Sequence, residues 1–327
     1  MSGNPVRVAI VGARGIGKHH AKWWALEGAD VCAIVGTSEA SMNTTRAALR
    51  ELFPFDGASF TDMAKMLEVT DPDIVDVCSP PPCHAGHVRA ALEAGADVLC
   101  EKPFVYDPQL SHEVLLTQAR ELAELAVSRL CHLGMCAQYA AGGQMFCRIW
   151  KDHFANKPIT KYCGHLASPA KGRAPDPERV WVDLSPHPLS VLRVLAPEGR
   201  IRWESVTVEF EGYRAVAWFY VERPGEVPLE CEIIAENTTE PPQNIRKFGF
   251  NDEVFTVEGE TDDRGVYRAR IETSLGNSIE RDMMHWIIHR FKKKAPLVGS
   301  AEARINLEWM LRFLQIARTG TRAGSGS

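Results

Sequence analysis

The first 136 residues alternate between short apolar runs and amphipathic segments, and this alternation constrains the fold more than any other feature of the chain. Residues 6–11 and 31–35 are typical of buried strands, and residues 15–27 between them have helical periodicity. The tripeptide Gly-Ala-Asp precedes the strand at 31–35 and again a strand at 98–100. Strands separated by helices predict β-α-β units, in which a parallel sheet carries helices on both faces.

The remaining periodicities divide the chain into two domains. Helices are expected at 40–52, 63–68 and 88–94, and a strand at 73–78. From about residue 160, polar and apolar residues alternate, as in 205–211 and 215–221, which predicts a half-exposed antiparallel sheet. Helical periodicity returns at 282–291 and 300–317. We therefore predict an α/β protein with a doubly wound parallel-sheet domain at 1–136, an α+β domain at 137–319 and a flexible Gly/Ser tail at 320–327.

Composition excludes several classes of protein. A chain of 327 residues with 45% hydrophobic content can bury two cores, and its net charge of −5 gives no attraction to nucleic acid or to an anionic membrane. No apolar run approaches the roughly 20 residues that cross a bilayer. The nine cysteines are odd in number and show no CxxC pair, which favours reduced thiols in a cytoplasmic protein. Cys78, Cys83 and His84 lack the second cysteine pair of a structural zinc site, so no metal is expected.

A glycine-rich turn, Gly12-Ala13-Arg14-Gly15-Ile16-Gly17, follows the first strand and opens the first helix. This is where a dinucleotide fold directs a helix N-terminus at the pyrophosphate. Arg14 holds the position of the second glycine, and Gly15 beside it relieves the crowding. Cofactor contacts are therefore expected from Gly12, Arg14, Gly15, Ile16 and Gly17.

The end of the second strand bears on the choice of cofactor. It reads Gly36-Thr37-Ser38, without the acidic residue that grips the free ribose hydroxyls of NAD. The hydroxyls of Thr37 and Ser38, with Arg14 or Arg46, favour NADP. Glu39 begins the next helix, and a small shift of the loop would bring it to the ribose, so NAD stays open.

The strand at 98–100 runs into Glu101-Lys102-Pro103. Open parallel sheets bind ligands at the carboxyl ends of their strands, which predicts that Glu101 and Lys102 lie on the rim of the binding crevice. The alternative is a surface ion pair without a function, as most exposed pairs are.

With these residues, the chain resembles the Gfo/Idh/MocA family of nicotinamide-dependent oxidoreductases. The resemblance rests on the glycine-rich turn, on Ser79-Pro80-Pro81-Pro82-Cys83-His84 followed by Ala90 to Gly95, and on Glu101-Lys102-Pro103. It implies a Rossmann domain joined to a domain with a large open antiparallel sheet that often pairs subunits, and hence a homodimer or homotetramer. It also implies that Lys102 hydrogen-bonds the substrate hydroxyl, while Glu101, Ser79 and Pro80 help to hold the cofactor. His84 either lines the cofactor cleft or has a capping or packing role.

The family usually supplies an Asp and a His four residues apart from its second domain, and Asp183 and His187 match that spacing. An imidazole suits the proton transfer that accompanies hydride transfer, so His187 is the expected base and a substrate contact. Asp183 either orients this imidazole or contacts a neighbouring substrate hydroxyl. Pro186 and Pro188 place the start of a helix around Ser185. The alternative to a catalytic pair is an Asp at the start of a helix and a surface histidine that is unrelated to it. Tyr139 and, more weakly, Gln138 are further substrate-binding candidates.

The predicted reaction is hydride transfer between NADP(H), or NAD(H), and a secondary alcohol or carbonyl of a sugar, cyclitol or related polyol. Two alternatives remain at this point. One is a glycosidase on the same scaffold, in which a retained cofactor oxidises the sugar transiently. The other is a non-catalytic sensor of cofactor or sugar, since a fold and a cofactor site do not guarantee turnover.

Overall fold

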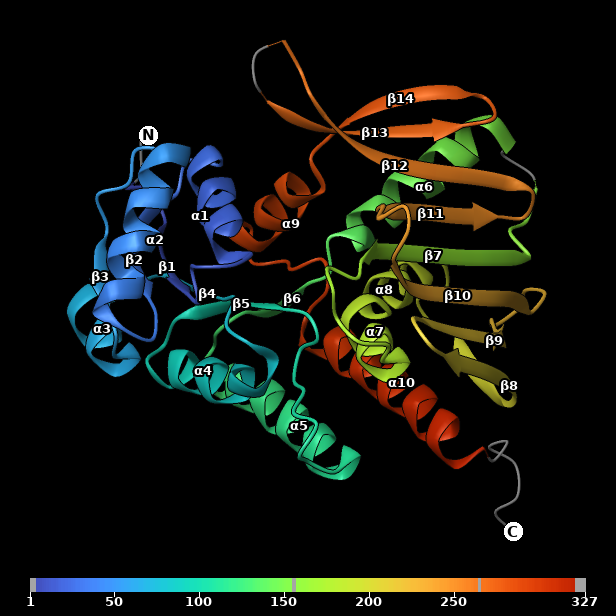
Figure 1. Ribbon diagram of the computed structural model, residues 1–327, viewed down its shortest axis with the longest axis horizontal. Coiled ribbons are helices and arrows are strands. Elements are labelled where there is room, and N and C mark those ends of the chain that lie inside the picture. The colour runs from blue at the N-terminus through green and yellow to red at the C-terminus, as the bar shows by residue number, and fades with distance from the viewer. Residues whose placement is uncertain (1–3, 155–156, 264–265, 321–327) are drawn as a thin grey trace. The chain divides into compact units, whose positions relative to one another are not determined.

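The computed structural model describes residues 4–154, 157–263 and 266–320 (Figure 1). The chain forms two compact units, Met1–Cys136 with Met284–Leu307, and Ala137–Met283 with Glu308–Ser327. Most of the predicted tail, residues 321–327, lies outside the described residues. None of the described helices is long and apolar enough to cross a bilayer.

The first unit is built on a six-stranded sheet with the order β3-β2-β1-β4-β5-β6, in which every pair of neighbours is parallel. Its strands are β1 (Arg7–Val11), β2 (Asp30–Val35), β3 (Ala58–Phe60), β4 (Ile74–Val77), β5 (Asp97–Glu101) and β6 (Leu133–Cys136). Strand β1 is fully apolar after Arg7 and buried, as parallel strands with helices on both faces require. The predicted doubly wound fold is confirmed.

Helices connect these strands: α1 (Gly17–Leu26), α2 (Glu39–Leu52), α3 (Met63–Thr70), α4 (Pro81–Glu93) and α5 (His112–Ser128). Side-chain oxygens of Ser38, Asp62 and Ser111 accept backbone N–H groups at the starts of α2, α3 and α5. Helix α4 begins seven residues before the predicted start at 88, so that prediction was too short. The reason is that Pro81 and Pro82 occupy the first turn, where a fixed φ favours the helix and no N–H is needed.

Helix α9 (Met283–Lys292) belongs to the first unit from Met284 onward, whereas the sequence predicts that all of 137–319 lies in the second domain. Met284, Ile287, Ile288 and Phe291 are at most 2% exposed and share a core with Trp24. The rings of Trp24 and Phe291 meet edge to face, with centroids 6.3 Å apart. Burial of this apolar helix face explains why a late segment of the chain packs with the early domain.

The second unit contains an eight-stranded sheet with the order β14-β13-β12-β11-β7-β10-β9-β8. Its strands are β7 (Lys161–Pro169), β8 (Arg200–Glu211), β9 (Arg214–Glu222), β10 (Leu229–Thr238), β11 (Ile245–Phe250), β12 (Glu253–Thr261), β13 (Tyr267–Thr273) and β14 (Gly276–Arg281). Among the described strands of this sheet, only β7 and β10 pair in parallel. The predicted, mainly antiparallel sheet is confirmed.

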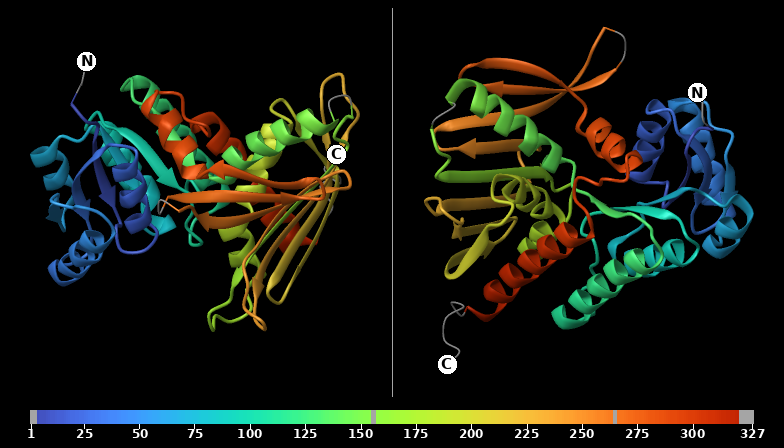
Figure 2. Two further views of the ribbon diagram at one scale, coloured as in Figure 1. Left: turned by 90° about the horizontal axis from the view of Figure 1, so that it is seen from above. Right: turned by 180° about the vertical axis from the view of Figure 1, so that it is seen from behind.

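Helices cover one face of this sheet (Figure 2). They are α6 (Tyr139–Phe154), α7 (Pro177–Leu184) and α8 (Pro186–Leu195), and α10 (Ser300–Thr319) belongs to this unit from Glu308. Phe146 on α6 stacks on Phe255 of β12 at 5.0 Å and lies 5.1 Å from the ring of Phe248 on β11. Trp181 on α7 packs against Phe210 and Phe313. These aromatic contacts pack α6 and α7 on the sheet.

Candidate functional site

The carboxyl ends of β1, β4 and β5 lie side by side in the first unit, because these strands are neighbours in a parallel sheet. The backbone N–H of Cys78, just after β4, donates to Val11 O at the end of β1 (2.8 Å). Gly12 has φ of +88°, and a Cβ there would lie 2.6 Å from the backbone N of Ser79. The first turn of the dinucleotide motif therefore packs directly on the Ser79 segment, and only glycine fits at position 12.

The start of α1 is suited to an anion. A Cβ on Gly17 would lie 2.5 Å from Gly12 O, so this glycine permits the tight entry into the helix. Among the described residues, no side chain caps this helix at Ile16 and no acidic residue occupies its first turn. Arg14 and Gly15 are exposed, and space around Gly15 is open. A pyrophosphate fits this helix N-terminus by charge and by the room that the glycines leave.

The end of β2 offers groups for either nicotinamide cofactor. Thr37, Ser38 and Glu39 are all exposed, and Ser38 Oγ accepts the backbone N–H of Ser41 (3.3 Å). Glu39 lies in the first turn of α2. Arg46 donates two hydrogen bonds to Ser59 Oγ, at 2.9 and 3.2 Å, and so is engaged with β3.

His84 joins the two loops that follow β4 and β5. Its Nε2 lies 2.7 Å from Ser79 O and its Nδ1 lies 2.9 Å from Pro103 O, and the ring is 1% exposed. Burial lowers the pKa of His84, although the two carbonyls oppose this shift. The ring thus ties the Ser79-Pro80 turn to the turn after Lys102. Ser79 Oγ in turn pairs with His87 Nδ1 (2.9 Å).

Glu101 is the last residue of β5 and Lys102 follows it, both partly buried. The backbone N–H of Lys102 donates to Glu101 Oε2 (3.2 Å), and the Lys102–Pro103 peptide is cis. Within the first unit, the glycine-rich turn, Ser79-Pro80 and Glu101-Lys102 therefore share one edge of the sheet.

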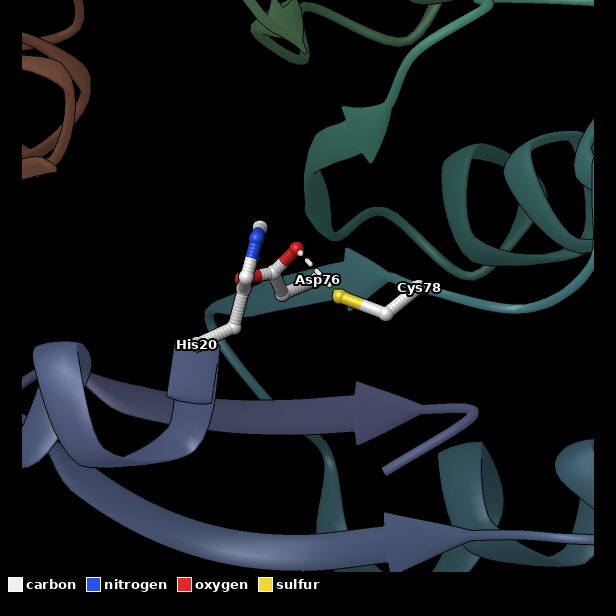
Figure 3. A group of neighbouring side chains, drawn as sticks. All are labelled: His20, Asp76 and Cys78. Carbon is white, nitrogen blue, oxygen red and sulfur yellow. Dashed lines mark hydrogen bonds and ion pairs between the residues drawn. The ribbon is translucent and has the colours of Figure 1, made fainter. Parts of the chain in front are cut away.

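A buried polar cluster lies beneath this edge (Figure 3). His20 projects from α1 toward β4, where its Nδ1 lies 2.9 Å from Oδ2 of the fully buried Asp76. Its Nε2 lies 3.1 Å from Glu101 Oε1, and Trp24 Nε1 donates to Asp76 Oδ2 at 2.6 Å. Burial lowers the pKa of His20, but the charge of Asp76 outweighs this effect and raises the pKa well above its usual value. The imidazolium therefore donates one hydrogen bond to each carboxylate.

Two overlapping sets in this cluster contain metal-ligand atoms close together, His20 with Asp76 and Cys78, and His20 with Glu101 and Cys136. Each ring nitrogen of His20 faces a carboxylate, and burial raises the pKa of Cys136 to about 12 and that of Cys78 well above its usual value. A metal ion at either set would have to displace these protons. Cys83 is exposed, and neither it nor His84 belongs to a ligand-like group in the described part of the chain.

In the second unit, Asp183 lies near the end of α7 and His187 in the first turn of α8. Ser185, the residue at the junction, keeps helical dihedral angles (φ −63°, ψ −27°), and its N–H donates to Trp181 O (2.9 Å). The predicted start of a helix around Ser185 is confirmed. Because the backbone stays helical through the junction, Asp183 and His187 keep the spacing of residues that face the same side of a helix.

Tyr139, at the start of α6, lies beside His187. The two rings meet edge to face at 5.2 Å, and the Tyr139 ring also lies 5.2 Å from that of Phe248. Burial raises the pKa of the Tyr139 hydroxyl, which the charge of Arg246 and a hydrogen bond from it oppose. The phenol therefore stays protonated. Tyr139, His187 and Arg246 gather at one end of the helix-covered face, whereas Gln138 precedes α6 and is partly buried.

Three residues of these clusters were not predicted, namely His20, Asp76 and Arg246. Trp24 is fully buried, as expected for a packing tryptophan on the first helix, but nothing in the sequence gives its neighbour His20 a polar role. A hydrogen-bonded role for Asp76 could have been predicted. A carboxylate in the apolar strand Ile-Val-Asp-Val needs hydrogen-bond partners, because both faces of the strand are covered. No motif pairs Arg246 with Tyr139.

Taken together, the parallel sheet, the glycine-rich turn and the open helix N-terminus define the first unit as a dinucleotide-binding domain of the Rossmann class. Residues 6–133 match the model of the oxidoreductase family with an NAD-binding Rossmann fold, Gfo/Idh/MocA. The first unit is therefore similar to the NAD-binding domain of this family.

Several characterised proteins that are similar to this chain are dehydrogenases. D-glucoside 3-dehydrogenase of Escherichia coli K12 is 34% identical over 127 residues, which are 38% of this chain and 34% of that protein. Inositol 2-dehydrogenase of Pseudomonas savastanoi is 25% identical over 230 residues, 69% of this chain and 64% of that protein. The matched region thus spans less than two thirds of each of these relatives. The solved scyllo-inositol dehydrogenase of Lactobacillus casei, with NAD(H) and scyllo-inositol bound, shares the fold with a TM-score of 0.71 at 14% identity, over 95% of this chain and 96% of that one.

Proposed function

We propose that this protein is a dehydrogenase that transfers a hydride between a nicotinamide cofactor and a secondary alcohol, or the matching carbonyl, of a sugar, cyclitol or related polyol. The observation that carries the proposal is the shared strand edge of the first unit, where the glycine-rich turn touches Ser79 and His84 ties Ser79 to the turn after Lys102. A cofactor held at this turn and a lysine at the neighbouring strand end suit hydride chemistry. The dehydrogenase activities of the relatives support the same class of substrate.

When bound, the nicotinamide ring supplies the hydride acceptor or donor. In the proposed reaction, Lys102 donates a hydrogen bond to the substrate oxygen and stabilises the charge that develops there. His187 accepts the hydroxyl proton, and Asp183 orients the imidazole. Tyr139, kept protonated by its burial, donates a hydrogen bond to a neighbouring substrate hydroxyl. Polyol oxygens offer the acceptors and donors that these four side chains require.

For the cofactor, we favour NADP, through contacts of Arg14, Thr37 and Ser38 with the 2′-phosphate. The exposed Glu39 is the group that would instead bind the ribose hydroxyls of NAD. Titration with NADPH and with NADH, followed by quenching of the eight tryptophans, tests this choice. Tighter binding of NADPH, lost in Arg14→Gln, is the expected result. Equal binding, or tighter binding of NADH that Glu39→Gln weakens, contradicts it.

Lys102→Ala tests the catalytic assignment. We expect this variant to lose at least about a hundredfold in kcat, as when a group aimed at developing charge is removed, and to keep its cofactor affinity. Lys18→Ala is the matched control, because this partly buried lysine lies on α1 outside the proposed substrate contacts. Turnover by Lys102→Ala at the wild-type rate would remove the central assignment.

We also propose that the sheet of the second unit pairs subunits, through the face opposite α6, α7 and α8. Partly or fully exposed side chains such as Trp218, Tyr220 and Ile234 lie along that face. Light scattering on the purified protein tests this, with a dimer or tetramer expected and a monomer contradicting it.

A further inference from the structure

The cluster of His20, Asp76 and Glu101 connects two parts of the proposed site that are 81 residues apart in sequence. His20 lies on α1, the helix that the glycine-rich turn opens, and Glu101 ends β5 immediately before Lys102. We propose that His20 is a positioning residue: its ring, anchored by Asp76, fixes the Glu101 carboxylate and through it the main chain at Lys102. This inference rests on the proposed function, in which Lys102 contacts the substrate.

The contacts determine how the carboxylate is held. Glu101 Oε1 faces His20 Nε2 (3.1 Å), and Glu101 Oε2 accepts the backbone N–H of Lys102 (3.2 Å). Both oxygens are therefore engaged, one by α1 and one by the residue whose side chain is to meet the substrate. Asp76 holds the far side of the His20 ring and is itself fixed by Trp24 (2.6 Å). Such supporting hydrogen bonds determine how accurately a reactive group is placed.

Charge explains why a histidine is needed here. The charged or titratable groups that face His20 are Asp76 and Cys78, in β4 and just after it, Glu101 at the end of β5 and Cys136 at the end of β6. The thiols stay protonated, so the imidazolium balances the charge of one of the two carboxylates, the buried Asp76 and the partly buried Glu101. Without that charge, the carboxylates of Asp76 and Glu101 would repel each other across the site. The ring of Trp23, 5.5 Å away, closes another side of the imidazole.

His20→Gln removes the charge but keeps a polar side chain, and His19→Gln is the matched control, because His19 is the preceding residue on α1 and is exposed. We expect kcat of His20→Gln to fall about tenfold or more while cofactor affinity changes little, as for other residues that orient a functional group. His19→Gln should match the wild type.

The double variant His20→Gln/Glu101→Gln gives a second test. If His20 acts through Glu101, the double variant should lose about as much activity as Glu101→Gln alone, because residues in contact are not additive. Losses that multiply in the double variant would overturn the positioning role. A His20→Gln variant that unfolds earlier but keeps the wild-type kcat would overturn it as well.

An activity-independent measurement separates this inference from the proposed function. Nitrogen NMR of wild-type protein with labelled histidine reports how many ring nitrogens of His20 carry a proton. Two protonated nitrogens at neutral pH, together with a shifted Lys102 amide resonance in His20→Gln, are expected even if no polyol is oxidised. A singly protonated ring, or an unshifted Lys102 amide, overturns the inference, whereas absence of turnover with every polyol overturns the proposed function alone.

Discussion

Asp76→Asn is the substitution whose effect on stability can be worked out most directly. Asp76 is fully buried and accepts hydrogen bonds from His20 and from Trp24 through the same oxygen, Oδ2. Asparagine is of the same size but carries no charge, so the His20 imidazolium loses one of its two anionic partners. Removing one member of a buried ion pair costs about 3–5 kcal/mol. We expect the unfolding free energy of the first unit to fall by about this amount, a large part of a typical domain's stability of roughly 5–15 kcal/mol.

Hydrogen exchange of amides in α1 and β4 measures this loss, with amides of the second unit as an internal reference. Asp30→Asn is the control, because Asp30 is exposed at the start of β2, and a surface substitution usually stays within about 0.5 kcal/mol. The pH dependence has a definite sign. Because the folded pKa of His20 is raised, its contribution is full below the ordinary value of 6.5 and is lost as the pH rises through the folded pKa. A difference between wild type and Asp76→Asn that stays constant or grows toward alkaline pH would refute the reasoning.

Three further predictions concern separate parts of the molecule. His187→Ala should remove the limb of the kcat pH profile that reports the catalytic base, and an unchanged profile would exclude His187 from that role. Phe291→Ala should destabilise the first unit by about 3–5 kcal/mol, because this ring is 1% exposed and packs on Trp24; exchange protection lost in the second unit instead would show that α9 belongs there. Gly12→Ala should abolish cofactor binding, because the new Cβ would meet Ser79 N at 2.6 Å, and wild-type affinity would contradict the close packing of the two turns.

The sheet and helices of the first unit could be predicted because local patterns set them. The apolar strand at residues 6–11, the glycine after each of two helices and the Gly-Ala-Asp repeats each mark an element by its own residues. The assignment of α9 could not be predicted in this way. Its apolar face is equally compatible with either core, and only the packing of Phe291 on Trp24, from the opposite end of the chain, decides between them.

The residues of the proposed site also differ in whether the sequence alone can predict them. Glu101 and Lys102 could be proposed from the sequence because they stand at the end of a strand. Asp183 and His187 could be proposed because their spacing matches the family that the chain resembles. The partners of these residues could not be predicted from the sequence. His20 reaches Asp76 and Glu101 across 56 and 81 residues of sequence, and Arg246 meets Tyr139 only because β11 packs against α6. Contacts between distant segments depend on the register of the fold, which no motif records.

Transfer of a labelled hydride tests the central claim most directly. Polyols deuterated at the carbinol carbon, beginning with inositols and glucosides, are incubated with the protein and NADP or NAD, and the reduced cofactor is analysed by mass spectrometry. The proposed function predicts that deuterium appears in the reduced nicotinamide with wild-type protein and not with Lys102→Ala. Tight binding of cofactor without transfer of deuterium from any of these polyols would contradict it.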